Sequence, residues 1–208
     1  MATITKLTCQ TKNPDRVNLF LDGEFCCGIS NLLVVQQHLY ETKEIDEKDL
    51  RTLIFESDKN TAFDYALNYI SRYTPTKFQL RKKLFDKDYG AVVVDYVTDK
   101  LIDYGYINDA ELAKCYAEYN KEIKGKNRIR QDLLAKHVDK SIIDEVLNEV
   151  EFDSESIFNL ARKHCRNKDL DDQKYVARLV RYLQYRGYQW EEISSCLAQL
   201  KVEMRNQD

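Results

Sequence analysis

Histidine, cysteine and carboxylate side chains are the residues of this sequence that could perform acid–base, nucleophilic or metal chemistry. The three histidines are His38, His137 and His164, and the six cysteines are spread without any C-x-x-C pair. His164 and Cys165 are adjacent, so on a helix they point about 100° apart and make poor ligands for one metal ion. His137 suits a helix carboxyl end, where an imidazolium interacts favourably with the helix dipole. These positions predict no catalytic residue and no metal site.

The sequence also lacks the glycine-rich and nucleophile motifs of common enzymes. It contains no GxxxxGKS/T, GxGxxG or GxSxG pattern, so neither a phosphate-binding loop nor a nucleophile elbow is indicated. Its carboxylates are predicted to lie on solvated helix faces, where they form no pair for general acid–base catalysis. We therefore expect a protein that is not an enzyme, holds no cofactor and has no nuclease or nucleotide hydrolase activity.

Basic side chains are the remaining residues that could form a functional surface. They gather at three comparable places of the chain, which are Lys77, Arg81, Lys82, Lys83 and Lys87, then Lys124, Lys126, Arg128, Arg130 and Lys136, then Arg178, Arg181 and Arg186. A single cluster of this kind is equally well explained by an ordinary solvated helix face. Its recurrence at equivalent positions favours a shared basic groove that binds a nucleic-acid backbone or an acidic protein surface.

Composition limits how strong that binding can be and where the protein works. The 208 residues include 32 Lys and Arg against 35 Asp and Glu, so the chain is not a general nucleic-acid coat. The scattered cysteines are typical of reduced cytosolic thiols. The longest aliphatic runs are too short to cross a bilayer, and the amino terminus does not resemble a secretory signal. The sequence predicts a cytoplasmic protein that does not enter a membrane.

The first 57 residues are predicted to form a small mixed module of strands and short helices. An alternating stretch ends at Asp22-Gly23, which is a strong signal for a two-residue hairpin turn. Across this turn Phe20 should face Phe25, and Leu19 should face Cys26. The expected elements are a three-stranded meander over about residues 3–30 and short helices near 30–39 and 46–57.

From residue 58 onward an apolar pattern with helical spacing occurs three times. Leu84 is followed 49 positions later by Leu133 and a further 50 positions later by Leu183, and six other columns keep the same spacing. Six of the seven columns are apolar in every copy. The seventh column is always basic and holds Lys87, Lys136 and Arg186. We predict that the three leucines are nearly fully buried.

Helix start and stop signals divide each copy into three helices. Thr74 and Pro75 are predicted to begin the second helix of the first copy, after a first helix over 60–73. Because each helix has a single apolar stripe, neighbouring repeats must cover one another, and we expect an elongated, curved array. The fold class is therefore mainly α, with a strand-rich module at 1–57 and three-helix repeats at 58–107, 108–152 and 153–208.

Five stretches of the sequence together resemble the RecX family. They are ALNYISRYTPTKFQLRKKL at 66–84, YINDAELA at 106–113, KGKNRIRQDL at 124–133, LQYRGY at 183–188 and RVNLFLDGEF at 16–25. Each stretch alone is a weak signal, but their order and spacing across nearly the whole chain are specific.

The resemblance implies a non-catalytic negative regulator of the RecA recombinase. RecX proteins are described as elongated helical-repeat proteins that bind the RecA filament on single-stranded DNA, lie in its groove and restrain its recombinase and coprotease activities. As partners we expect the RecA filament and single-stranded DNA, contacted directly or through RecA, and we expect a monomer. Tandem repeats suit a polymer because several units can bind at once.

Two turns depart from the family pattern. The usual Lys/Arg-Gly pair after the second helix is Lys87-Asp88 in the first repeat and Lys136-His137 in the second. Since a glycine that readily adopts the left-handed conformation is lost, a different turn is predicted at both places. The usual aspartate pair before the second repeat is Asn108-Asp109, which keeps a helix cap.

The predicted contact residues combine the basic clusters with the family resemblance. We expect them to line one face of the array with their charges reaching outward. They are Arg72, Lys83, Lys87, Lys124, Arg128, Lys136, Arg181 and Arg186. Two other functions remain open, namely a helix-turn-helix transcription regulator, which would concentrate Arg, Asn and Gln on one helix, and a helical-repeat scaffold without DNA contact.

Overall fold

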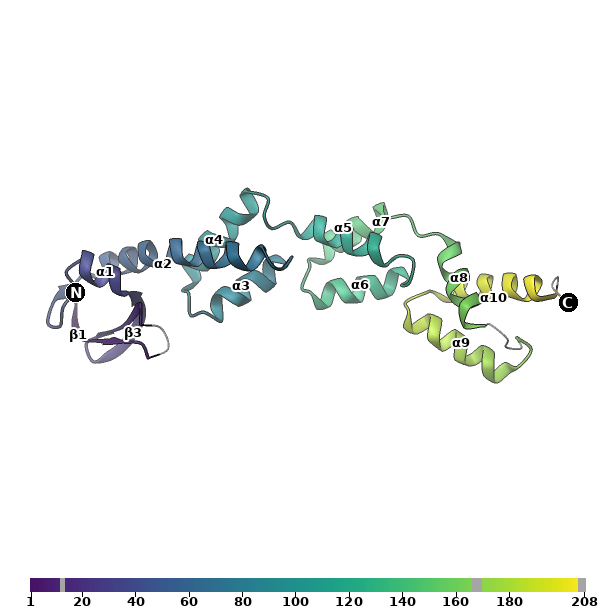
Figure 1. The fold of residues 1–208 in the computed structure, drawn as a ribbon, viewed down its shortest axis with the longest axis horizontal. Coiled ribbons are helices and arrows are strands. Elements are labelled where there is room, and N and C mark those ends of the chain that lie inside the picture. Colours follow the sequence, from purple (N-terminus) through teal and green to yellow (C-terminus); the bar gives the residue numbers. More distant parts are fainter. Residues whose placement is uncertain (12–13, 166–169, 206–208) are drawn as a thin grey trace. The chain divides into compact units, whose positions relative to one another are not determined.

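The computed structural model describes residues 1–11, 14–165 and 170–205 of the chain (Figure 1). These residues fall into two compact units, Met1–Ile107 and Asn108–Asp208. Residues 12–13 of the predicted module and residues 166–169 and 206–208 of the predicted third repeat lie outside the described residues.

Helices dominate the described residues, and a small antiparallel sheet lies at the amino end, which confirms the mainly α fold class. The elements are β1 (Ala2–Cys9), β2 (Arg16–Leu21), β3 (Glu24–Ser30), α1 (Asn31–Gln36), β4 (Glu44–Ile45), α2 (Glu47–Ile70), α3 (Lys77–Phe85), α4 (Ala91–Asp103), α5 (Asp109–Asn120), α6 (Lys126–Ala135), α7 (Lys140–Glu149), α8 (Ser154–His164), α9 (Gln173–Tyr185) and α10 (Trp190–Arg205).

The sheet has the strand order β3-β2-β1-β4. Asp22 and Gly23 adopt positive φ angles of 49° and 92°, as a two-residue hairpin turn requires. Phe20 pairs with Phe25 as predicted, but the predicted pairing of Leu19 with Cys26 is wrong. Leu19 pairs instead with the next residue of β3, because a β-bulge inserts one extra residue at that point. The two-residue β4 is too short to produce an alternating pattern that sequence could reveal.

The long helix α2 corrects the prediction of separate helices near 46–57 and 60–73. Polar residues around Asp58 resemble a helix start, yet the whole of Glu47–Ile70 is one helix and contains neither glycine nor proline. The Asp58 side chain is only 3% exposed, and its Oδ1 lies 3.1 Å from Nη1 of Arg16 on β2. This ion pair joins the sheet to α2, and the predicted boundary at 57/58 falls inside the helix.

The apolar columns form separate buried clusters, one within each predicted repeat, and the sheet has a cluster of its own. Leu84, Leu133 and Leu183 have no exposed surface, which confirms their predicted burial. They lie on α3, α6 and α9, which we call the second helices. Each second helix packs against the third helix of its own repeat, which is α4, α7 or α10.

The turns after the three second helices share one conformation, so the predicted difference at the two non-glycine turns is wrong. Asp88, His137 and Gly187 have φ angles of 62°, 58° and 91°. In each turn the next amide donates back to the carbonyl of the buried leucine, from Tyr89 at 3.3 Å and from Val138 at 3.1 Å in the first two repeats. This bond is the outer one of a Schellman motif, and aspartate and histidine adopt its left-handed residue despite their Cβ atoms.

The start of α3 also differs from the prediction. Thr76, not Thr74, is the N-cap residue, because its hydroxyl accepts from the Gln79 amide at 3.2 Å. The Gln79 side chain accepts in turn from the Thr76 amide at 3.1 Å, which completes a capping box. Asn108 caps α5 as predicted, since its side chain accepts from the Glu111 amide at 3.0 Å.

Candidate binding surface on the second helices

The basic column at the end of each second helix lies over a tyrosine ring. In the first two repeats the ring comes from the first helix, α2 or α5, and in the third it comes from α9 itself. A cation held over a ring face keeps its stem against the protein while its charge stays near solvent. The distances from the cation to the ring centroid are 5.5 Å for Lys87 and Tyr65, 5.7 Å for Lys136 and Tyr116, and 5.2 Å for Arg186 and Tyr182.

Two arginines of the predicted basic clusters are used inside their own repeats. Arg81 on α3 lies 2.5 Å from Oδ1 of Asp95 on α4. The same pair recurs 49 residues later, between Arg130 and Asp144. Both ion pairs join a second helix to a third helix, so these arginines stabilise the repeat rather than offer free charge.

The predicted contact residues of the first unit are Arg72, Lys83 and Lys87, and all three are exposed. Lys83 lies on α3, and Arg72 follows the end of α2. Within the described part of the chain, neither Arg72 nor Lys83 forms an ion pair with a carboxylate. Their positive charges are therefore available to a partner.

In the second unit, two of the predicted cations form ion pairs with the same carboxylate, that of Asp132. Nζ of Lys124 donates to Oδ2 of Asp132 at 2.8 Å and to the Tyr116 hydroxyl at 2.9 Å. Nε of Arg128 lies 3.2 Å from Oδ1 of the same aspartate. Asp132, one helical turn after Arg128, pairs with both cations, so these three side chains together keep one net positive charge.

The pKa values of this cluster reflect its ion pairs. Burial raises the pKa of Asp132, but the hydrogen bonds from Lys124 and Tyr116 outweigh it and bring the pKa below the usual value. Burial lowers the pKa of Lys124, but its hydrogen bonds to Asp132 and Tyr116 leave the pKa above the usual value. Both groups therefore keep their charges at neutral pH.

Two predicted cations of the second unit connect its repeats. The Arg128 guanidinium lies 5.1 Å from the centroid of the Tyr185 ring on α9. Nη1 of Arg186 donates to the Ile123 carbonyl, which precedes α6, at 3.3 Å. Arg181 is exposed, and its Nε donates to the Ala177 carbonyl of its own helix at 3.2 Å. The structure thus connects the second and third repeats through Arg128 on one side and Arg186 on the other.

Five residues of this surface are missing from the sequence prediction, namely Asp132, Tyr65, Tyr116, Tyr182 and Tyr185. Asp132 is four residues after Arg128, a spacing that places both side chains on the same face of α6. It is eight residues after Lys124, which lies just before α6 begins. These spacings could have indicated the ion pairs of this cluster. Tyr185 has no comparable local signal, because it meets Arg128 only across two repeats.

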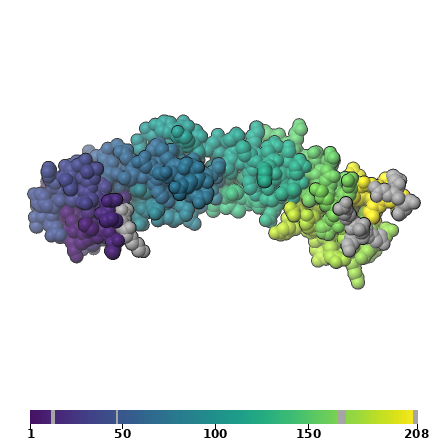
Figure 2. All heavy atoms as spheres, viewed as in Figure 1, coloured from purple at the N-terminus to yellow at the C-terminus, as the bar shows by residue number. Residues whose placement is uncertain are grey.

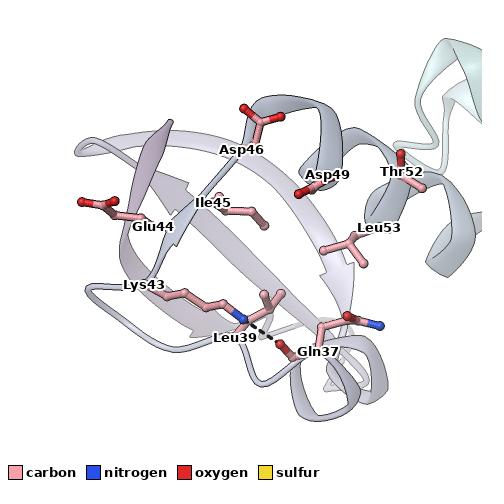
Figure 3. Close-up of a pocket in the computed structure, with 9 residues that line it drawn as sticks. All are labelled: Gln37, Leu39, Lys43, Glu44, Ile45, Asp46, Asp49, Thr52 and Leu53. Atoms are coloured by element: carbon pink, nitrogen blue, oxygen red, sulfur yellow. Dashed lines mark hydrogen bonds between the residues drawn. The ribbon is translucent and has the colours of Figure 1, made fainter.

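The amino-terminal module contains a pocket whose lining includes polar side chains that cap neighbouring helices. It has a volume of about 360 Å³ and is lined by Leu39, Lys43, Asp46 and Asp49, among others (Figure 3). Nζ of Lys43 donates to the Gln37 carbonyl at 2.9 Å and so caps the carboxyl end of α1. The Asp46 side chain accepts from the Lys48 amide and caps α2.

Among residues 1–11, 14–165 and 170–205, no cluster of three or more histidine, cysteine or acidic side chains could hold a metal ion. No helix in those ranges combines the length and the apolar character that crossing a bilayer requires.

Family models match three parts of the chain. Residues 2–46 match the amino-terminal domain of regulatory protein RecX, residues 108–147 match the second RecX three-helix domain, and residues 151–197 match the third.

Whole-chain relatives carry the same name. The chain is 32% identical to a regulatory protein RecX of Clostridium tetani, over 95% of this chain and 94% of the relative. It is 34% identical to one of Clostridium beijerinckii, over 95% of both chains.

Two solved structures are also similar. A crystal structure of a regulatory protein RecX superposes with a TM-score of 0.62 at 25% identity, over 93% of this chain and 98% of the other. The crystal structure of RecX from Lactobacillus salivarius has a TM-score of 0.65 over 70% of this chain and 97% of its own, and at 24% identity it supports the fold alone.

Proposed function

This chain belongs to the RecX family of regulatory proteins, and we propose that it restrains the RecA recombinase in the cytoplasm by binding the RecA filament on single-stranded DNA. Binding alone accounts for the effect in this proposal, with no reaction catalysed by the chain. The partner offers phosphates and protein carboxylates along a repeating surface, which complements recurring cations.

The observation that carries the proposal is the cation found over a tyrosine ring at the end of every second helix. A column that is basic in three copies, at Lys87, Lys136 and Arg186, is not required by the buried core beside it. Exposed Arg72, Lys83 and Arg181 add charge near the same helices. Several weak contacts on one chain would together bind a polymer far more tightly than each contact alone.

The test is a quadruple alanine variant of exposed cations, Arg72, Lys83, Lys87 and Arg181. Its matched control removes the same charge from four exposed lysines away from the second helices, which are Lys48, Lys114, Lys140 and Lys201. Neither set includes Arg128 or Arg186, because those two connect repeats. Both variants should keep the helical content and melting temperature of the parent, since exposed charges contribute little stability.

Binding to RecA-coated single-stranded DNA is then measured at two salt concentrations, alongside inhibition of RecA strand exchange. We expect the surface variant to lose at least about tenfold in affinity and to show a weaker salt dependence than the control. Equal losses in both variants would indicate non-specific attraction. Full binding by the surface variant would exclude these cations as the contact, and binding to bare duplex DNA but not to the filament would favour a transcription regulator.

A further inference from the structure

Two backbone hydrogen bonds join the second and third repeats at the start of α6. The Gly125 amide donates to the Arg186 carbonyl at 2.9 Å, and the Asn127 amide donates to the Gly187 carbonyl at 3.3 Å. Gly125 is the N-cap of α6 and has no side chain to satisfy the first amides of the helix. The carbonyls of the next repeat take that role. Figure 2 shows atoms of the two repeats in contact on the face in view.

The two glycines approach each other too closely for any side chain. A Cβ on Gly125 would lie 2.6 Å from the carbonyl carbon and oxygen of Gly187. A Cβ on Gly187 would come closer still to the backbone nitrogen of Arg128. Since these neighbours are backbone atoms, they cannot move aside as a flexible side chain could. We call this contact the glycine joint.

Side chains on both sides of the glycine joint complete the connection. Arg128 lies over the Tyr185 ring, and Arg186 donates to the Ile123 carbonyl. Tyr185 remains 70% exposed, so a partner can reach the pair. The joint therefore does more than connect two repeats, because it holds Arg128 of the second repeat over Tyr185 of the third, a cation–ring pair that takes one member from each repeat.

We infer that Gly125 and Gly187 are positioning residues, which hold α6 and α9 so that the second and third repeats bind their polyanionic partner as one body through Arg128 and Tyr185. The identity of the partner in this inference rests on the proposed function, whereas the glycine joint rests on the backbone contacts alone. Without the joint, each repeat would have to be ordered separately on binding, at a cost in affinity.

The equivalent positions one repeat earlier show why glycine is specific to this joint. By the spacing of the columns, Thr76 is the equivalent of Gly125 one repeat earlier, and His137 is the equivalent of Gly187. Both carry a Cβ, and the Thr76 side chain already caps its own helix. A backbone approach as close as that of the glycine joint requires glycine at both positions.

The chain offers a matched control for each glycine. Gly125→Ala is compared with Gly90→Ala, because Gly90 is also an N-cap without a side-chain bond, has similar φ and ψ angles, and has open space around it. Gly187→Ala is compared with Gly105→Ala, where φ is also positive, at +74°, and nothing lies within 4 Å. The controls separate loss of the joint from loss of an N-cap glycine and from backbone strain.

The first measurement is hydrogen exchange of the full chain without any partner. We expect the amides of Gly125 and Asn127 to exchange about tenfold faster in Gly125→Ala and Gly187→Ala, while α3 keeps its protection. The two control variants should exchange like the parent at these amides. If Gly125→Ala exchanged like Gly90→Ala, the joint would not exist in solution, and the inference would fail.

The second measurement is affinity for RecA-coated single-stranded DNA. Gly125→Ala and Gly187→Ala should each lose about as much affinity as the double variant Arg128→Ala with Tyr185→Ala. The two glycine variants should do so without losing any charged side chain. Faster exchange with full affinity would overturn the positioning role and leave the proposed function standing. If the parent itself failed to bind, the proposed function would fall, while the exchange data would still decide whether the joint exists.

Discussion

The helices α3 and α6 occupy equivalent places in two repeats, yet their amino ends are completed in different ways. At α3 the residue in the N-cap position is Thr76, and its side chain and that of Gln79 satisfy the first amides locally. At α6, 49 residues later, the same position is Gly125, and carbonyls of the following repeat take over. The cap of α3 is therefore local, whereas that of α6 comes from the following repeat.

The difference shows how one substitution in a repeat changes what a helix depends on. A threonine keeps the start of α3 independent of any residue outside 76–79. A glycine gives up the local cap but lets another backbone come within hydrogen-bonding distance. The second and third repeats should therefore lose structure together, whereas the start of α3 should depend on the first unit alone.

The largest expected effect comes from truncating the buried leucine of each of these two helices, Leu84 on α3 and Leu133 on α6. Leu84→Ala and Leu133→Ala should each cost about 2–5 kcal/mol of unfolding free energy, because both side chains have no exposed surface. Hydrogen exchange should accelerate only within residues 1–107 for Leu84→Ala. For Leu133→Ala it should accelerate in α6 and also in α9. Confinement of the second effect to the second repeat would contradict the coupling.

A smaller effect is expected at the local cap of α3. Thr76→Ala should cost about 0.5–2 kcal/mol, since the Gln79 amide loses its acceptor. Thr76→Ser keeps the hydroxyl and is the matched control, with a smaller cost from the lost methyl group. Unit-resolved chemical denaturation would measure both. If the alanine variant were as stable as the serine variant, the capping box would contribute nothing to α3.

The smallest effect concerns pH, where the two units should respond in opposite directions. Burial raises the pKa of Asp58 in the first unit above its usual 3.8, although Arg16 opposes the change. In the folded state this carboxyl holds its proton more tightly, so its contribution is full below pH 3.8 and is lost as the pH rises through the folded pKa. Asp132 has a lowered pKa, so its contribution is present above 3.8 and is lost as the pH falls through the folded pKa.

Hydrogen exchange followed as the pH is lowered from about 6 to 3 would test these signs in each unit separately. Asp58→Asn should flatten the response of the first unit, and Asp132→Asn that of the second. Identical responses in the two single variants would show that neither carboxyl governs the pH dependence of its unit.

Helices, their columns and their buried leucines could be predicted because each depends on neighbours in sequence. The spacing from Leu84 to Leu133 to Leu183 is enough to place three residues in three cores, since a helix repeats every few residues. The Asp22-Gly23 hairpin is equally local. Continuity of α2 was harder to see, because Asp58 looks like a cap until Arg16, 42 residues earlier, is found beside it.

The candidate surface was predicted less completely. Charge at Lys83 or Arg181 follows from the residue type and a helix face, and exposure of both agrees with that reasoning. The roles of Arg128 and Arg186 do not follow, because their partners Tyr185 and Ile123 lie 57 and 63 residues away. Exposed arginine and bridging arginine have the same local sequence pattern.

By itself, the sequence determined the repeat, the helix pattern and the positions that must carry apolar or basic side chains. These are set by periodicity and by contacts within a few turns. Tertiary structure alone decided which arginines connect two repeats and that Gly125 meets Gly187. The physical reason is that a close backbone contact between two repeats depends on their packing in three dimensions. The residues next to each glycine in the sequence do not indicate which distant backbone it will meet.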